Sequence, residues 1–91
     1  MIRRHPTGRS AVRVTFALPA DEVDRVSVVG DFNEWTPGRH TLVKRANGTR
    51  SVAVTVPKDS VHRFRYLAEG GRWFDDPEAD RHTADGSVLE V

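Results

Sequence analysis

The 91-residue sequence contains no cysteine, which excludes a disulfide scaffold and a thiolate metal site. It also lacks any apolar run near the roughly 20 residues of a membrane-spanning helix. Neither charge sign dominates, because 14 Lys and Arg stand against 13 Asp and Glu and the formal net charge is +1. Without a positive excess, the sequence predicts neither nucleic acid nor an anionic membrane as a partner.

The first ten residues, MIRRHPTGRS, are basic but have no apolar centre of the kind found in signal peptides. The length of the chain suits one domain and not two. We therefore predict a flexible N-terminal arm over residues 1–10, a single domain over residues 11–91, and a cytoplasmic location.

The hydrophobic residues that are present follow a period of two. Val12, Val14, Phe16 and Leu18 alternate with less apolar residues, which is typical of a half-buried strand that Pro19 ends. Short runs with turn residues at their ends predict further strands at residues 25–29, 41–45, 52–56, 61–68, 73–74 and 87–91, with a polar loop at 75–86. No stretch has helical periodicity, so the pattern predicts an all-β sandwich of about seven strands.

The dipeptide Asn47-Gly48 predicts a hairpin between the strands at 41–45 and 52–56, because both residues tolerate positive φ. A two-residue turn would place Val43 opposite Val52, whereas an odd-length loop would place Leu42 there. A slip of one residue exchanges the two faces of the strand. The sequence leaves this register open.

No catalytic or metal-binding set stands out. None of the four histidines, at positions 5, 40, 62 and 82, lies in a nucleophile motif. The acidic residues from Asp75 to Asp80 lack the spacing and central glycine of an EF-hand loop, and Asp76-Pro77 is a common turn former. Gly70-Gly71 suits a hairpin rather than a phosphate-binding loop. We expect no enzyme activity, no metal and no cofactor.

The two tryptophans are the most informative residues. Trp35 lies in the turn-rich segment VVGDFNEWTPG, where it is either a lid over the end of the sandwich or a platform for a ligand. Trp73 and Phe74 are adjacent, so in a strand only one of them faces the core. If Phe64 points inward, its neighbour Arg65 points outward, and an outward Trp73 would lie beside it across a hairpin.

A surface that combines arginines with tryptophan suits two classes of ligand. Arg63, Arg65 and Arg72 with Trp73 could hold single-stranded nucleic acid, whose bases stack on aromatic rings. They could also hold a sugar, whose C–H face packs on an indole while its hydroxyls bond to charged side chains. The near-neutral net charge favours the sugar, because phosphate binding requires a stronger positive field.

Several of these segments resemble the glycogen- and starch-binding modules of carbohydrate-binding family 48. Residues 28–35, VVGDFNEW, resemble the GxFNxW signature found in the β subunit of AMP-activated protein kinase and in the early-set domains of isoamylases and glycogen branching enzymes. Residues 62–73, HRFRYLAEGGRW, resemble the YxYKFxVDGxW segment of this family. Asp76-Pro77 is similar to its DP pair, and residues 87–91 to its closing strand. The resemblance extends over about residues 12–91.

The resemblance implies an immunoglobulin-like, early-set β-sandwich that recognises an α-1,4-glucan such as glycogen, starch or a maltooligosaccharide. It implies a non-catalytic site made by Trp35, Arg65 and Trp73, in which Trp35 is a platform for a glucose ring. The implied partners are the glucan and, in addition, a glucan-metabolising enzyme or a second copy of the chain.

The sequence also departs from the family. Arg65 replaces a lysine, which exchanges a point charge for a planar fork. The hairpin that includes Gly70, Gly71 and Arg72 is one residue longer. The loop before the last strand is shorter, has no match to the family's sugar-clasping leucine, and has Gly86 where the family has an asparagine. These departures leave a second hypothesis, a packing or protein-interaction sandwich that has lost sugar binding.

Overall fold

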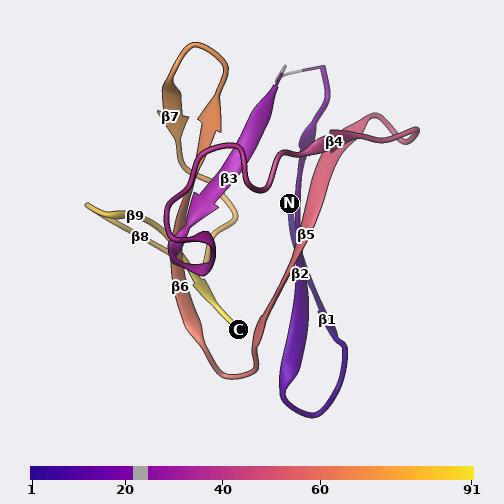
Figure 1. Cartoon of the computed structure of the whole chain (residues 1–91), viewed down its shortest axis with the longest axis vertical. Coiled ribbons are helices and arrows are strands. Elements are labelled where there is room, and N and C mark those ends of the chain that lie inside the picture. The colour runs from indigo at the N-terminus through magenta and orange to yellow at the C-terminus, as the bar shows by residue number, and fades with distance from the viewer. Residues whose placement is uncertain (22–24) are drawn as a thin grey trace.

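The computed structural model describes residues 1–21 and 25–91, which fold into β-strands with one short 3-10 turn and no α-helix (Figure 1). The predicted all-β class is therefore confirmed. The elements, in chain order, are β1 (Ile2–Pro6), β2 (Ala11–Pro19), β3 (Val26–Gly30), η1 (Asp31–Asn33), β4 (Val43–Lys44), β5 (Thr49–Pro57), β6 (Val61–Ala68), β7 (Arg72–Phe74), β8 (Arg81–Thr83) and β9 (Gly86–Glu90).

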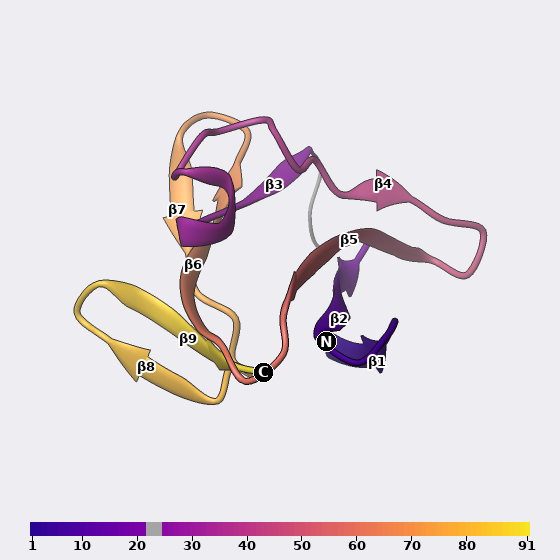
Figure 2. The same ribbon diagram turned by 60° about the horizontal axis from the view of Figure 1, so that its bottom comes forward.

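The strands form two antiparallel sheets that face each other, as the tilted view in Figure 2 shows. One sheet has the order β1-β2-β5-β4, and the other has the order β3-β6-β9-β8, with β7 also paired to β6. The first order corresponds to strands A-B-E-D of an immunoglobulin constant domain, and β3-β6-β9 corresponds to its strands C-F-G. The fold is an immunoglobulin-like β-sandwich.

Strand β6 is the centre of the second sheet. Strand β3 pairs with its residues 64–68. On the opposite edge, β7 pairs with residues 66–68 and β9 with residues 61–64. Strands β7 and β9 thus follow each other along one edge of β6, so the hairpin that carries Trp73 stands next to the last strand of the chain.

The core lies between the two sheets and is built by the period-two pattern. The inward residues of β2, at positions 12, 14, 16 and 18, are all buried, as the sequence predicted. The Phe16 ring lies 5.0 Å from that of Phe64, and Phe64 lies 5.8 Å from Tyr66. These rings are among the largest buried side chains, so their burial contributes strongly to the hydrophobic stabilisation of the domain.

Two strands lie where the sequence predicted none, which raises the number from about seven to nine in the described residues. Strand β1 occupies part of the segment predicted to be a flexible arm, and it pairs with β2 along its whole length. Strand β8 lies within the predicted loop at residues 75–86 and pairs with β9. Apart from Ile2, their residues are exposed, so neither strand shows the alternation that reveals a half-buried strand.

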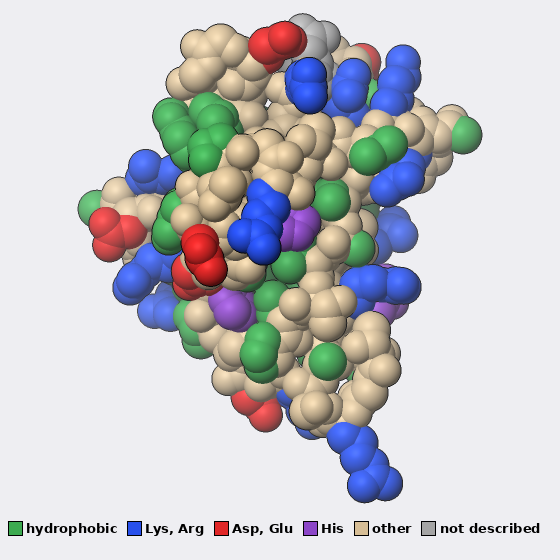
Figure 3. All heavy atoms as spheres, viewed as in Figure 1, with side chains coloured by type: hydrophobic (Ala, Val, Ile, Leu, Met, Phe, Trp, Pro, Cys, Tyr) green, Lys and Arg blue, Asp and Glu red, His purple; other side chains and the backbone are tan. Residues whose placement is uncertain are grey.

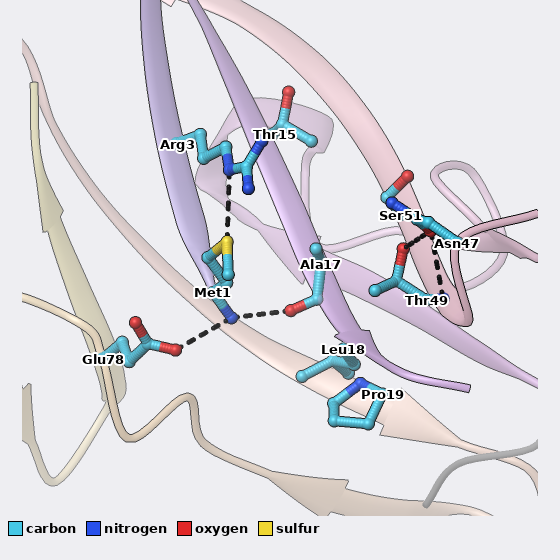
Figure 4. Close-up of a pocket in the computed structure, with 10 residues that line it drawn as sticks. All are labelled: Met1, Arg3, Thr15, Ala17, Leu18, Pro19, Asn47, Thr49, Ser51 and Glu78. Atoms are coloured by element: carbon cyan, nitrogen blue, oxygen red, sulfur yellow. Dashed lines mark hydrogen bonds and ion pairs between the residues drawn. The ribbon is translucent and has the colours of Figure 1, made fainter. Parts of the chain in front are cut away.

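Polar contacts hold the N-terminus, just before β1, against β2 and Glu78 (Figure 4). The Met1 amine donates to the Ala17 carbonyl at 2.6 Å and lies 3.1 Å from the Glu78 carboxylate. Nearby, Asn47 Oδ1 accepts from the backbone N–H and hydroxyl of Thr49, which closes the β4–β5 hairpin. A hollow of about 280 Å³ lies between these two groups.

The structure decides the register of this hairpin. Val43 pairs with Ser51 and Lys44 with Arg50, which is the odd-length alternative. Leu42 is consequently 1% exposed and part of the core, whereas Val43 is 51% exposed. The close contact of Arg45 N–H with the Thr49 carbonyl, at 2.7 Å, sets this register.

Candidate functional site

The turn that carries Trp35 begins where β3 ends. Gly30 is the last residue of β3. The position requires glycine, because an added Cβ would lie 2.7 Å from both the Arg63 carbonyl oxygen and the Phe32 ring. The buried Asn33 side chain then folds back, accepting from the Gly30 N–H and donating to the Val28 carbonyl, each at 3.0 Å. These bonds replace the strand ladder and fix the direction in which the chain leaves the sheet.

Trp35 is held out of the core by its backbone. Its N–H donates to the Gly30 carbonyl at 2.9 Å, and Glu34 and Trp35 both have left-handed φ, at 57° and 55°. Two consecutive non-glycine residues in this region are uncommon, and for a bulky side chain the conformation is strained. The indole is 41% exposed.

Two histidines support the same turn. Asn33 Nδ2 lies 3.0 Å from His40 Nδ1. The bond to the Val28 carbonyl identifies Nδ2 as the NH2 group, which can only donate, so His40 Nδ1 is the acceptor. Burial, and then the charge of Arg39, lower the pKa of His40, which favours the neutral ring that can accept. The Phe32 ring packs edge-on against both histidines, and His62 Nδ1 lies 2.7 Å from the Asp31 carboxylate.

His62 also links the turn to the β5–β6 connection. Its Nε2 lies 2.7 Å from the Ser60 hydroxyl, so serine, imidazole and carboxylate stand in line. The Ser60 hydroxyl donates its hydrogen to the Pro57 carbonyl at 2.5 Å, so towards His62 Nε2 its oxygen is the acceptor. The arrangement is that of a structural link. Sequence reasoning missed it because residues 31 and 60–62 are joined only by the pairing of β3 with β6.

Trp73 lies on the outer face of the second sheet. It pairs with Leu67, while its neighbour Phe74 packs on Tyr66 with ring centroids 5.3 Å apart. This confirms that only one of the two adjacent aromatics faces the core. Trp73 is 47% exposed. Because Leu67 also pairs with Ser27 of β3, these three side chains form one row across the outer face.

Arg65 lies in the next row of the same face. It pairs with Val29, and its Nε lies 3.5 Å from the Asp75 carboxylate at the end of β7. Its Nη2 donates to the Ala84 carbonyl at 2.8 Å in the β8–β9 turn. Its side chain passes over Gly86, where an added Cβ would lie 3.0 Å from Arg65 Cγ.

The structure therefore brings Arg65 and Trp73 onto one face, which is the arrangement expected if Phe64 points inward and Trp73 is the outward member of its pair. The chain that follows Trp35 reaches the same face, because the Gly38 N–H lies 3.4 Å from the outward Ser27 hydroxyl. In the view of Figure 3, hydrophobic side chains gather over β7 and the adjoining end of β6. Val29, on this face, is fully buried although it is not part of the main core cluster.

The acidic segment after β7 has a structural role. Asp76 is fully buried, accepts from the Tyr66 hydroxyl at 2.6 Å and accepts from the Glu78 N–H at 2.8 Å. The His82 ring lies 2.6 Å from the Asp76 carbonyl. Within residues 1–21 and 25–91, no three His, Cys, Asp or Glu side chains are arranged to hold a metal ion. In the same residues, no helix has the length and apolar character needed to cross a membrane.

No family model matches the chain, but several curated enzymes do. It is 37% identical to the 1,4-alpha-glucan branching enzyme of Salinibacter ruber over 79 residues, or 85% of this chain. It is 44% identical over 70 residues to a 1,4-alpha-glucan branching enzyme of Xanthomonas campestris pv. campestris, and 34% identical over 77 residues to that of Deinococcus radiodurans. These alignments cover 76% and 82% of this chain.

The matched segment is a small part of each relative. The chain spans 12%, 10% and 11% of the Salinibacter, Xanthomonas and Deinococcus enzymes, respectively. The sandwich is thus similar to one segment of glucan branching enzymes, and the rest of those enzymes has no counterpart in the alignment.

Proposed function

We propose that this sandwich is a non-catalytic α-glucan-binding module of the early-set type, with Trp35, Arg65 and Trp73 as its sugar contacts. The observation that carries the proposal is the half-exposed state of both indoles, 41% and 47%, in segments that meet the outer face on which Arg65 lies. The similarity to 1,4-alpha-glucan branching enzymes supports an α-glucan as the ligand class. The resemblance to glycogen-binding modules noted above points to the same residues.

The exposed indoles suit a sugar because they give it an apolar surface. An aromatic side chain offers about 150–250 Å², and burying part of it at about 25 cal/mol per Å² yields roughly 2–3 kcal/mol before ordering costs. Two such platforms and one charged donor correspond to a dissociation constant of about 10 µM to 1 mM. Repeated sites on a long glucan raise the effective affinity.

Arg65 retains donors for a ligand despite its protein contacts. A guanidinium carries five N–H groups, and in the described residues Arg65 uses Nη2 on Ala84 and directs Nε towards Asp75. The remaining N–H groups of a half-buried side chain can bond to sugar hydroxyls. Its fixed orientation lowers the entropy lost on binding.

A second candidate function is a packing module that docks on a glucan-metabolising enzyme or on another copy of the chain. The observation that favours it is the tight β8–β9 turn. This turn places Gly86 under Arg65 and offers no leucine to clasp a sugar chain. In this case Arg65 serves mainly to hold Ala84 and Asp75. Light scattering after size-exclusion chromatography tests self-association, and a strict monomer at high concentration argues against that form.

Titration with maltoheptaose and co-sedimentation with glycogen test the sugar-binding proposal. We expect quenching or a shift of the tryptophan fluorescence in the wild-type chain, and a loss of most of the affinity in Trp35→Ala and Trp73→Ala. Val43→Ala is the matched control, since Val43 is equally exposed on the other sheet. Unchanged fluorescence and no co-sedimentation at millimolar sugar would contradict the proposal and leave the packing function.

A further inference from the structure

A shallow hollow of about 160 Å³ lies next to the strand that carries Trp73, and the loop that follows Trp35 lines it. Residues that line it include Ser27 of β3, the loop residues Pro37, Gly38 and Thr41, Leu67 of β6, and Glu69 in the β6–β7 turn. It is separate from the larger hollow beside Met1, which lies against the other sheet. None of the three predicted contact residues lines it, so it is an addition to the proposed site.

The pairing of the strands places this hollow relative to Trp73. Thr41 forms an isolated bridge with Ser27, Ser27 pairs with Leu67, and Leu67 pairs with Trp73. These four residues form one row across the outer face, with neighbouring strands about 4.8 Å apart. The hollow covers the first three members of the row, and Trp73 is the fourth.

The loop places the hollow relative to Trp35 as well. Pro37, which lines it, is two residues beyond Trp35. The Gly38 N–H bonds to the Ser27 hydroxyl, and the Thr41 hydroxyl donates to the Gly38 carbonyl at 3.3 Å. These contacts hold the loop against β3, so the loop that follows Trp35 forms a fixed wall of the hollow.

The lining has the mixed chemistry that a sugar ring requires. Leu67 and Pro37 supply apolar surface, and the hydroxyls of Ser27 and Thr41 keep hydrogen-bonding capacity beyond the bonds described above. The Glu69 carboxylate accepts hydrogen bonds only, and in the described residues it has no ion-pair partner. Arg25 also lines the hollow, and a guanidinium offers donors beside the Glu69 acceptor. A sugar hydroxyl both donates and accepts, so it complements this set.

We propose that this hollow is a second sugar subsite, which takes a glucose residue of an α-glucan chain beyond the units that stack on Trp35 and Trp73. In it, Glu69 accepts hydrogen bonds from the sugar hydroxyls over the apolar floor of Leu67. The inference rests on the proposed function and specifies the length of glucan that the module prefers. The inference predicts that a glucan long enough to occupy both tryptophans and the hollow gains contacts with Glu69 that a shorter one lacks.

Calorimetric titration with maltotriose and with maltoheptaose tests the subsite. Hydrogen bonds to a carboxylate are stronger than those to a neutral amide, although an open site reduces the difference, so we expect Glu69→Gln to weaken maltoheptaose binding about three- to tenfold. Glu69→Ala, which removes both oxygens, should weaken it at least as much. For maltotriose, the change should be less than about twofold.

Asp59→Asn is the matched control. It also removes one carboxylate from an exposed turn, it lies at the opposite end of β6, and asparagine tolerates its left-handed φ of 59°. It should bind both sugars as the wild type does. Among the described residues, the Glu69 side chain makes no hydrogen bond and its backbone N–H donates to the Arg25 carbonyl at 3.0 Å, so its variants should melt as the wild type does.

Three outcomes separate the possibilities. Selective weakening of maltoheptaose in the Glu69 variants supports the subsite. Wild-type affinity for maltoheptaose in these variants, while Trp73→Ala still abolishes binding, overturns the subsite and leaves the proposed function intact. Absence of any binding by the wild-type chain at millimolar sugar overturns both.

Discussion

The Tyr66 hydroxyl donates to the Asp76 carboxylate at 2.6 Å, and both residues are fully buried. The bond joins β6 to the segment that connects β7 and β8. Each group needs the other, because a buried phenol requires an acceptor and a buried carboxylate requires donors. The Asp76 carboxylate receives a second bond from the Glu78 N–H, which fixes the turn that follows β7.

Tyr66→Phe should destabilise the domain while leaving its fold intact. The ring packing is kept, but the Asp76 carboxylate loses a buried donor, a change that costs about 1–3 kcal/mol. For a domain of this size, each kcal/mol lowers Tm by about 4–8 °C. Thermal and urea unfolding measure the effect, with Asp85→Asn in the exposed β8–β9 turn as a control. A loss below about 0.5 kcal/mol would mean that water or another group satisfies Asp76.

The same pair predicts how the protein responds to alkali. Burial, and then the nearby Asp76 charge, raise the pKa of Tyr66 well above its ordinary value. Above about pH 10 the unfolded chain loses the phenolic proton while the folded chain retains it, so the free energy of unfolding decreases as the pH rises.

Tyr66 is the sole tyrosine of the sequence, so its phenolate absorbance reports this one group. We expect that absorbance to appear together with alkaline unfolding, followed by circular dichroism. Phenolate formation in a chain that remains folded near pH 10 would contradict the buried bond.

The sequence was sufficient to predict the sandwich because its core strands carry the signal that a half-buried strand requires. Alternation in residues 12–18 and 62–68 predicted the central strands of both sheets, and the structure has them as β2 and β6. Strands β1 and β8 escaped prediction because they are stabilised by backbone pairing at the sheet edges, and their side chains are mostly exposed. Periodicity carries no information about such strands.

In the candidate site, too, local sequence patterns predicted some features, whereas others depend on contacts between strands. Alternation predicted that one of Trp73 and Phe74 faces outward, and that Arg65 does so if Phe64 points inward. The contact of His62 with the Trp35 turn, in contrast, depends on segments distant in the sequence. Asp31 meets His62 only because β3 pairs with β6. The hollow at Glu69 likewise depends on the bridge between Ser27 and Thr41, which no local pattern predicts.

His40 should make the stability of the Trp35 turn depend on acid. Its pKa is lowered in the folded chain by burial and by Arg39, and Nδ1 accepts a bond that the protonated ring cannot accept. Below about pH 6.5 the unfolded chain takes up a proton that the folded chain resists. This part of the stability is therefore present above pH 6.5 and is lost as the pH falls through the lower, folded-state pKa of His40.

Urea unfolding between pH 7.5 and pH 5 measures this slope. His40→Gln, which is neutral throughout, should flatten it, whereas His5→Gln on the exposed β1 should not. NMR titration of the imidazole protons gives the pKa of His40 directly. A His40 pKa at or above about 6.5 would contradict the acceptor role assigned to its Nδ1.

Gly86→Ala should be among the most damaging single substitutions in the chain. Gly86 has a φ of 126°, and an added Cβ would lie 2.9 Å from the Phe64 carbonyl oxygen, 3.0 Å from Arg65 Cγ and 3.1 Å from Arg65 Nε. The strained backbone and the overlap together should cost about 2–4 kcal/mol.

A double-mutant cycle with Arg65→Ala separates the two causes. Removing the Arg65 side chain leaves the backbone strain and the Phe64 carbonyl but eliminates the side-chain overlap, so Gly86→Ala should cost about 1 kcal/mol less in that background. Urea unfolding of the wild type, both single variants and the double variant gives the coupling. Strict additivity would show that Arg65 moves aside freely. In that case Arg65 would not be held in one orientation over Gly86, and its preorganisation for a sugar would be lost as an argument.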